Sequence, residues 1–406
     1  MPYHARTYSL RNSREPLLSP GERVMSRQSS LELVHLANFN STNIGNGALA
    51  NGLEHTMSED IERSIRWSRE AWDDYTFRKL DFDQTFVDKV NATDGLIVGG
   101  AVTFNGRDYN DRTGTRFELP FELWDKLKKP IVFYGLSYRN WPGQVYHHAD
   151  KLRQMVEKAL ASEKIIFSVR NDGTKAWLKT MVGIDSDAII EVPDSAVFVE
   201  AHAGDYPEIV NGARNIMVAF NDEDAVRRYD ERGAHSRETV IAALVEVLER
   251  LAERYPINII LCPHYFDDFK MMSAFIERIK PRLAHQNMVA SGLCRVKDTS
   301  YFYGRYMRAD LAISMRVHSM SPCIGLGVPM VALTTQDRMS DFIARLELQN
   351  QAVDAFDPLV AEKLYAKAVY TLDHGADVRD SFARARAKLR DETRVFHQRL
   401  DKLFSG

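Results

Sequence analysis

The sequence predicts an α/β protein with two successive domains, each built on a parallel sheet. Three observations support this prediction. The chain has 406 residues, which exceeds the roughly 150 residues of a typical domain. Short β-rich runs alternate with amphipathic helical stretches, and the alternation starts again after residue 195. Such alternation is typical of parallel strands covered by helices on both faces.

The N-terminal part of the chain divides into a tail and a first domain. Residues 1–30 contain five arginines and no apolar core segment, so we expect a disordered basic tail and not a secretory signal. A first Rossmann-like domain is expected over residues 31–195. An amphipathic helix is expected at 148–162. The predicted strands of this domain are 31–38, 94–100, 130–137, 163–170 and 187–194.

The pattern continues in a second Rossmann-like domain, expected over residues 196–375, with its clearest helix at 236–255. The final segment, 376–406, repeats apolar residues with a period near 3.6, which predicts an amphipathic helix that packs back on the molecule. The predicted strands of the second domain are 214–220, 257–263, 287–291, 309–314 and 328–334.

Composition excludes several classes of protein. The formal net charge of −3 does not suggest a nucleic-acid partner. The three scattered cysteines, Cys262, Cys294 and Cys323, form no CxxC pair, so we expect no disulfide framework and a reducing cytoplasm. No apolar run reaches the ~20 residues that span a bilayer, which leaves at most a peripheral membrane contact, at the inner face.

Polar and glycine residues follow several predicted strands, where ligands gather in open α/β sheets. Asn43, Gly45 and Asn46 precede a helix whose free N–H groups attract anions or hydroxyls, although an ordinary Asn-capped turn explains them as well. The other candidates in the first domain are Gly99, Gly100, Arg139 and Trp141. A tryptophan beside polar groups suits a sugar ring, but loop packing is the rival explanation for Trp141.

Two further strand ends carry titratable or charged side chains. Arg170 lies at the end of the run 163–170 and has a buried salt bridge as its rival explanation. His264 follows the run 257–263 and is interpreted as a binding residue, while the acidic residues after it could cap the next helix.

The stretch "AISMRVHSMSPCIGLG" gives the strongest signal. Arg316 and His318 follow a predicted strand and precede a small-residue helix, for which Ser319 or Ser321 is the expected N-cap and Pro322 an early position. An arginine beside a helix N-terminus favours phosphate or carboxylate. A histidine titrates near neutral pH and can move a proton. The stretch therefore predicts an anion-binding corner capable of acid–base chemistry, in which no metal-ligand spacing is found.

In order along the chain, the motifs "NIGN", "IVGG", "VRND", "PDSAVF", "PHYFDD" and "MRVHS" resemble those of the polysaccharide pyruvyl transferase family. The resemblance covers about residues 31 to 350. The sequence departs from the family pattern at Asn46, where an acid is usual, at Ala101, which breaks a glycine triplet, and at Arg338, which replaces a lysine.

The resemblance implies two Rossmann-like domains that face each other across a GT-B-like cleft, with the acceptor on the first domain and the donor on the second. It implies transfer of a pyruvyl group from phosphoenolpyruvate to a sugar of a polysaccharide or its precursor, which forms a ketal and releases phosphate without a cofactor or metal. Alternatives are a GT-B glycosyltransferase with a nucleotide-sugar donor and a non-catalytic carbohydrate-binding protein.

The same resemblance assigns the candidate residues to roles. Arg316 and His318 are the expected catalytic pair, with His318 as the general acid. The residues expected to bind the donor are Arg170, His264, Arg316, Val317, His318, Ser319 and Arg338. Those expected to bind the acceptor are Asn43, Gly45, Asn46, Gly99, Gly100, Arg139 and Trp141. The acceptor sugar, whether it is lipid-linked, and the oligomeric state stay open.

Overall fold

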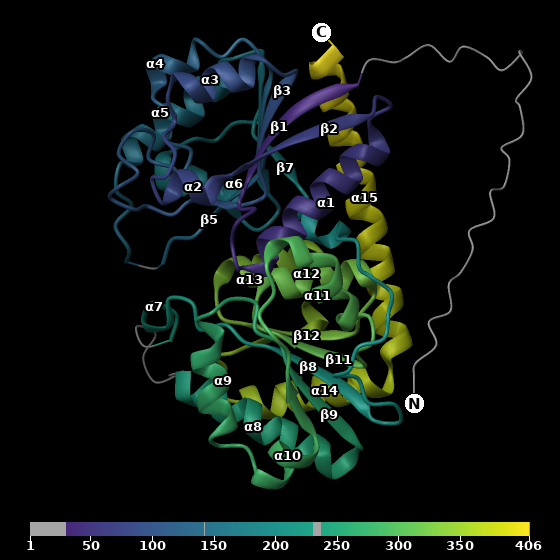
Figure 1. Ribbon diagram of the computed structural model, residues 1–406. Coiled ribbons are helices and arrows are strands. Elements are labelled where there is room, and N and C mark those ends of the chain that lie inside the picture. The colour runs from purple at the N-terminus through teal and green to yellow at the C-terminus, as the bar shows by residue number, and fades with distance from the viewer. Residues whose placement is uncertain (1–29, 142, 230–236, 406) are drawn as a thin grey trace, which may run out of the picture.

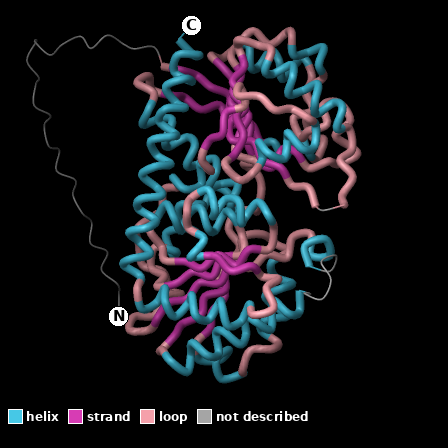
Figure 2. The backbone as a smooth tube through the Cα atoms, turned by 180° about the vertical axis from the view of Figure 1, so that it is seen from behind, coloured by secondary structure: helices cyan, strands magenta, loops and turns pink. Residues whose placement is uncertain are grey.

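The computed structural model describes residues 30–141, 143–229 and 237–405, so positions 1–29 of the expected basic tail lie outside the described residues. The described chain forms two parallel sheets, each with helices on both faces (Figures 1 and 2). The predicted fold class of two α/β domains is confirmed.

The first sheet has the strand order β2-β1-β3-β5-β6-β7, and β4 pairs with β5. Its strands are β1 Leu31–Ala37, β2 Ile65–Ala71, β3 Gly95–Gly99, β4 Val102–Phe104, β5 Ile131–Tyr138, β6 Ile165–Arg170 and β7 Ile190–Val192. The accompanying helices are α1 Ile44–Asp60, α2 Trp72–Thr76, α3 Gln84–Asn91, α4 Phe121–Trp124, α5 Ala149–Leu160 and α6 Thr174–Val182. A short 3-10 helix at Ser195–Phe198 follows.

The second sheet has the order β10-β9-β8-β11-β12-β13. Its strands are β8 Arg214–Ala219, β9 Ile257–Leu261, β10 Met288–Ala290, β11 Leu311–Ser314, β12 Met330–Thr334 and β13 Ala352–Asp354. The helices are α7 Ala225–Tyr229, α8 Arg237–Arg254, α9 Asp268–Ile276, α10 Pro281–Gln286, α11 Thr299–Tyr306, α12 Val317–Leu326, α13 Asp337–Arg345, α14 Val360–Asp373 and α15 Gly375–Ser405.

Each central strand is buried on both faces because its side chains alternate between two cores. In β1, Leu31 and Leu33 belong to one apolar cluster, while Val34 and Leu36 belong to another on the opposite face. This continuous burial explains why the central strands could be predicted as apolar runs. Strand β2, which the sequence did not predict, lies at the sheet edge and is only partly buried.

Helix α15 connects the two domains. Its first half carries Phe382 and Leu389 into the apolar core shared with α11 and α12, and its second half carries Phe396 and Leu400 into a core of the first domain. Figure 1 shows this yellow helix running along both domains. The C-terminal helix therefore packs back on the molecule as predicted.

Polar contacts fix the second half of α15 to the first domain. Arg390 forms a bidentate ion pair with Asp60, with both N–O distances at 2.7 Å. His397 lies between Asp60 and the hydroxyl of Tyr134, at 2.7 and 2.8 Å. Because these groups are mostly buried, the ion pair and hydrogen bonds hold the two domains in one relative position.

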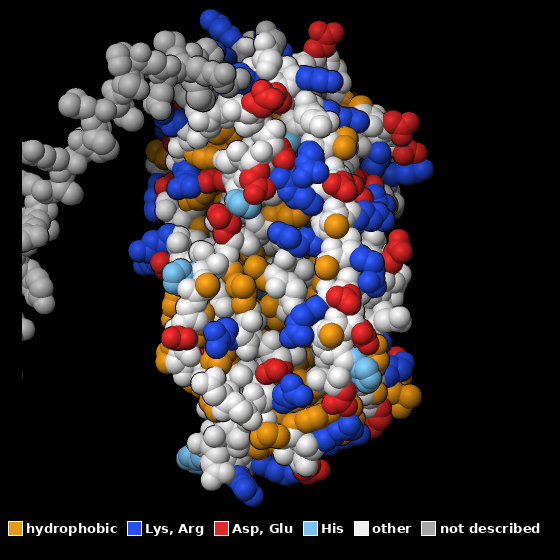
Figure 3. All heavy atoms as spheres, turned by 90° about the vertical axis from the view of Figure 1, so that its right-hand side faces the viewer, with side chains coloured by type: hydrophobic (Ala, Val, Ile, Leu, Met, Phe, Trp, Pro, Cys, Tyr) orange, Lys and Arg blue, Asp and Glu red, His pale blue; other side chains and the backbone are white. Residues whose placement is uncertain are grey.

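The surface over α15 carries basic and acidic side chains interspersed with each other (Figure 3). No helix among the described residues is long and apolar enough to cross a membrane.

Candidate active site

A polar cavity of about 260 Å³ lies where the carboxyl ends of the two sheets face each other. The first domain contributes the turn before α1, the end of α2 and the segment after β4, and the second contributes the residues that follow β8, β9, β11 and β12. Four arginines and two carboxylates line it: Arg116, Arg139, Arg316, Arg338, Asp73 and Glu223. The excess of positive charge suits an anionic ligand.

Helix α12 begins one turn earlier than the sequence predicted. Its first residue is Val317 and Arg316 is the N-cap, so neither Ser319 nor Ser321 caps it and Pro322 lies inside the helix. The Ser319 hydroxyl donates to the Arg316 carbonyl at 3.0 Å. Pro322 has no N–H to donate to the carbonyl of His318, four residues earlier. The Tyr303 hydroxyl donates to this carbonyl at 2.5 Å instead.

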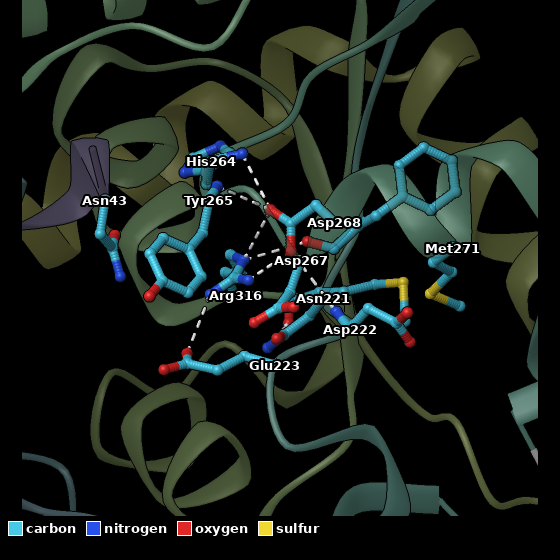
Figure 4. A network of polar contacts seen from close by, with 12 residues as sticks. Asn43, Asn221, Asp222, Glu223, His264, Tyr265, Asp267, Asp268, Met271 and Arg316 are labelled. Carbon is cyan, nitrogen blue, oxygen red and sulfur yellow. Dashed lines mark hydrogen bonds and ion pairs between the residues drawn. The ribbon is translucent and has the colours of Figure 1, made fainter.

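Arg316 is held by two carboxylates before any ligand arrives. Its guanidinium forms a bidentate pair with Asp268, and Nη1 lies 3.4 Å from Glu223 (Figure 4). Burial alone would lower the pKa of Arg316, but the two carboxylates outweigh burial and raise it. The charge of Arg316 is therefore largely compensated, and its position is fixed.

Glu223 links this network to the other domain. Burial would raise the pKa of Glu223, but Arg139, Arg316 and Arg228 hold it below the ordinary value. Arg139 comes from the end of β5 and forms an ion pair with Glu223. An ionised Glu223 thus bridges an arginine of each domain at the back of the cavity.

His318 is 15% exposed and projects between the domains. Its Nε2 accepts a hydrogen bond from Arg170 at 3.1 Å and lies 3.8 Å from Asp194. Burial, followed by the nearby Arg170 and Arg338, holds the pKa of His318 well below 6.5. The imidazole is therefore neutral at neutral pH, with its proton on Nδ1.

Gly45 allows the first domain to approach His318. A Cβ at Gly45 would lie 2.5 Å from the Cβ and Nδ1 of His318, a distance that no side chain tolerates without a shift. Asn43 caps α1 by accepting the Gly45 N–H at 3.2 Å. The turn before α1 therefore packs directly on the histidine of the opposite domain.

Two arginines of the cavity have no carboxylate partner among the described residues. Arg338 donates from Nη1 to the Tyr138 carbonyl at 3.1 Å, and its buried Nε has no acceptor. Arg116 donates to neutral oxygens of Asn38, Thr76 and Val102. Burial lowers the pKa of both arginines, and an anion in the cavity would relieve this cost.

The structure brings together some of the residues expected at the site and separates others. The cavity is lined by Asn43, Asn46, Arg139, Arg316, Val317, His318 and Arg338. Behind the cavity lie Arg170, Gly45, Ser319 and His264. Ser319 is buried, and His264 forms a hydrogen bond with the Tyr306 hydroxyl at 2.8 Å.

Gly99, Gly100 and Trp141 lie outside the lining of the cavity. Added Cβ atoms at the two glycines would meet Tyr134 and Leu49, so both glycines serve the packing of β3 against its neighbours. Trp141 is buried and its ring lies 5.0 Å from the guanidinium of Arg228.

The sequence reasoning did not single out several residues that line the cavity: Asn38, Asp73, Asn105, Tyr109, Arg116, Asn221, Glu223 and Gln336. Asn221 and Glu223 directly follow β8, so the strand-end rule could have found them. Arg116 lies in an irregular segment between β4 and α4, and nothing in the local pattern indicates its direction. Among the described residues no group of three or more His, Cys, Asp or Glu side chains could hold a metal ion.

The fold and the site define a GT-B-like protein with a polar cleft between two domains. A model of the polysaccharide pyruvyl transferase family matches residues 43–337, which is most of the chain. The chain therefore belongs to the polysaccharide pyruvyl transferase family. No curated protein sequence matches it.

The chain is similar to solved structures at low sequence identity, and the first of the following three supports the same overall architecture. The N-terminal domain of trehalose-6-phosphate phosphatase from Candida albicans is 12% identical, covers 95% of this chain and 98% of its own, and has a TM-score of 0.52. The glycosyltransferase SnogD from Streptomyces nogalater is 13% identical over 92% and 100%, with a TM-score of 0.44. UDP-GlcNAc 2-epimerase from Neisseria meningitidis is 11% identical over 87% and 94%, with a TM-score of 0.46.

Proposed function

We propose that this protein transfers the pyruvyl group of phosphoenolpyruvate to two hydroxyls of a sugar, which forms a pyruvate ketal and releases phosphate. One observation carries the proposal: a single interdomain cavity combines two arginines without carboxylate partners with a neutral, oriented histidine. Membership of the polysaccharide pyruvyl transferase family supports the same reaction class.

The charge pattern of the cavity fits the donor. Phosphoenolpyruvate carries a phosphate and a carboxylate, and arginine forks bind both groups in bidentate geometry. Arg338 and Arg116 are the cavity arginines that form no ion pair with a carboxylate among the described residues. Arg316 is already paired with Asp268, so we assign it to shaping and orienting the donor site.

His318 is the candidate for proton transfer to the donor. Ketal formation adds a proton to the methylene carbon of phosphoenolpyruvate, and one sugar hydroxyl then attacks the central carbon. A second hydroxyl attacks the same carbon, the bond to the phosphate oxygen breaks, and phosphate leaves with one of the two hydroxyl protons. The other proton balances the one that the methylene carbon gained.

Electrostatics determine when His318 can carry that proton. Burial and the neighbouring arginines keep the pKa of His318 low. A bound polyanion would raise this pKa because opposite charge favours the protonated form. Asp194, 3.8 Å from Nε2, is then the carboxylate that stabilises the imidazolium. Donor binding thus converts a neutral histidine into a general acid.

The proposal uses no metal and no cofactor beyond phosphoenolpyruvate as co-substrate. The acceptor enters from the first domain, where Asn43, Asn46 and Tyr109 offer amide and hydroxyl groups. A cytoplasmic location fits a phosphoenolpyruvate donor and three unpaired cysteines. Such an acceptor is either a free saccharide or one attached to a lipid at the membrane surface.

The proposal is tested by incubating the purified protein with phosphoenolpyruvate and a panel of β-galactose and mannose acceptors. We expect acceptor-dependent phosphate release and a ketal methyl signal in the NMR spectrum of the product. His318→Gln should lower kcat by ~10²–10⁴-fold, because a positioned general acid contributes that much. His285→Gln, on the short helix α10 of the second domain outside the cavity, is the matched control.

Two results would contradict the proposal. No phosphate release with any acceptor, together with turnover of a nucleotide sugar, would favour a GT-B glycosyltransferase. Full activity of His318→Gln would remove the histidine from the chemistry.

A further inference from the structure

A second cavity, of about 370 Å³, adjoins the first and belongs entirely to the N-terminal domain. Thr76, Tyr109 and Arg116 line both cavities, so the two spaces share these three residues as a common boundary on the first domain. No residue of the second domain lines the second cavity, and of the two arginines assigned to the donor only Arg116 borders it.

The volume of the first cavity limits what it can hold. Sites for drug-sized ligands occupy about 300–1,000 Å³, and the first cavity, at about 260 Å³, lies below that range. A phosphorylated three-carbon acid together with one sugar already fills a cavity of the volume that the first cavity has. Further sugars of the acceptor therefore lie outside the first cavity, and the adjoining second cavity is a space that can hold them.

The floor of the second cavity is fixed by polar contacts. Arg112 forms a bidentate ion pair with Asp81 at 2.7 and 3.0 Å. Glu118 accepts the backbone N–H groups of Arg112 and Thr113 at 3.1 and 3.2 Å. The pKa of Glu118 is raised by its burial. These groups give the cavity a polar surface with donors and acceptors for hydroxyls.

The rim of the cavity carries two exposed apolar or aromatic side chains among charged ones. Tyr109 is 52% exposed and Leu80 47% exposed, and Tyr109 lies between the two cavities. Exposed aromatic side chains beside polar groups suit the C–H faces and hydroxyls of a pyranose ring. Arg78 adds an exposed cation to the same rim.

We propose that the second cavity is a subsite for the acceptor saccharide, so that the preferred acceptor contains at least two or three linked sugars. The sugar that receives the pyruvyl group lies in the first cavity, Tyr109 contacts the junction, and the next sugars lie between Arg78, Arg112 and Asp111. This inference rests on the proposed function for the identity of the acceptor.

The test compares the binding of saccharides of increasing length to the full chain by isothermal titration. The probes are methyl β-galactoside, β-1,4-galactobiose and β-1,4-galactotriose, and the matching α-mannoside series, each with phosphoenolpyruvate present. We expect Kd to fall about tenfold from the monosaccharide to the trisaccharide in one series, which corresponds to ~1.4 kcal/mol of binding free energy from the added sugars. The same series are used as acceptors in the phosphate-release assay.

Two variants test the second cavity, one by removing a side chain and the other by filling the space. Arg78→Ala removes an exposed rim side chain, and Asp111→Trp fills the space from an exposed position. Both should abolish the tenfold gain between monosaccharide and trisaccharide. The matched controls Arg386→Ala and Asp380→Trp, at exposed positions of α15, should retain it.

The inference is overturned by equal affinity at every length, by no measurable binding in either series, or by an unchanged length gain in both cavity variants. Its failure is distinguishable from failure of the proposed function. Phosphate release with a monosaccharide and no length gain would overturn the subsite alone. A length gain in binding without phosphate release would keep the subsite and overturn the proposed reaction.

Discussion

The two walls of the interdomain cleft are built differently. On the second domain, Arg316 is 7% exposed and is fixed by Asp268, which is fully buried. On the first domain, Tyr109 and Phe77 are 52% and 73% exposed, and the neighbouring cavity opens to solvent. The donor wall, on the second domain, is a dense network of buried charges. The acceptor wall, on the first domain, carries Arg116, Arg139 and Asp73 at the cavity, but its outer part is an open surface of aromatic and polar groups.

This difference follows from what each wall has to bind. A small polyanion is held best by preorganised charges in a site that excludes water. A saccharide instead needs contact area and adaptable hydrogen-bonding groups. Gly45 and Glu223 join the walls, because the first packs on His318 and the second pairs with Arg139.

The largest effect on stability is expected when a charge is removed from the donor wall. Asp268→Asn leaves the buried Arg316 without its closest carboxylate, and such changes cost about 3–5 kcal/mol. The neighbouring Asp267→Asn removes only an exposed ion pair with Lys270 and should cost less than about 1 kcal/mol. Urea unfolding of both variants measures the difference, and equal losses would mean that Arg316 does not depend on Asp268.

A smaller effect is expected where the two walls touch. In Gly45→Ala the new methyl group would lie 2.5 Å from His318, so the imidazole must move. We expect kcat to fall by ~10²-fold, because a displacement near 1 Å can cost that much. Gly292→Ala is the control, because a Cβ there has open space. Unchanged turnover in Gly45→Ala would show that the position of His318 is not critical.

The pH dependence of stability gives a third and weaker test. Burial is the first cause that lowers the pKa of His264, His318 and His397, so the unfolded chain binds more protons than the folded one just below pH 6.5. The contribution of these three histidines to the unfolding free energy is therefore fully present above this pH and is lost on acidification.

The expected slope from pH 6.5 to 5 is up to about 1.4 kcal/mol per pH unit for each group. His264→Gln should reduce this slope, and urea unfolding at several pH values measures it. A stability that stays constant or rises over this interval would contradict the burial of neutral histidines.

Much of the fold could be predicted because the central strands are buried on both faces. The runs 94–100 and 309–314 form β3 and β11 for that reason. The edge strands β2, β4 and β13 were not predicted, because they are short or partly polar and their pairing depends on a neighbour distant in sequence.

The candidate site was only partly predictable. The strand-end rule located Arg316 and His318, and the family resemblance added Arg338. The structure places all three in one cavity. It could not show that Asp268 compensates Arg316 while Arg338 has no carboxylate partner among the described residues. Which cation is paired depends on contacts between segments that are distant in sequence, and a strand-end pattern carries no information about them.

The most direct test of the account is the affinity for phosphoenolpyruvate of the wild-type protein and of Arg338→Ala, measured by isothermal titration. Arg338 is assigned as a cation that binds the donor, and a hydrogen bond to a charged group contributes ~1.5–3 kcal/mol. The account predicts binding that weakens about 10- to 100-fold in Arg338→Ala and stays unchanged in Arg308→Ala, an exposed control. Equal affinity of Arg338→Ala and the wild-type protein would contradict it.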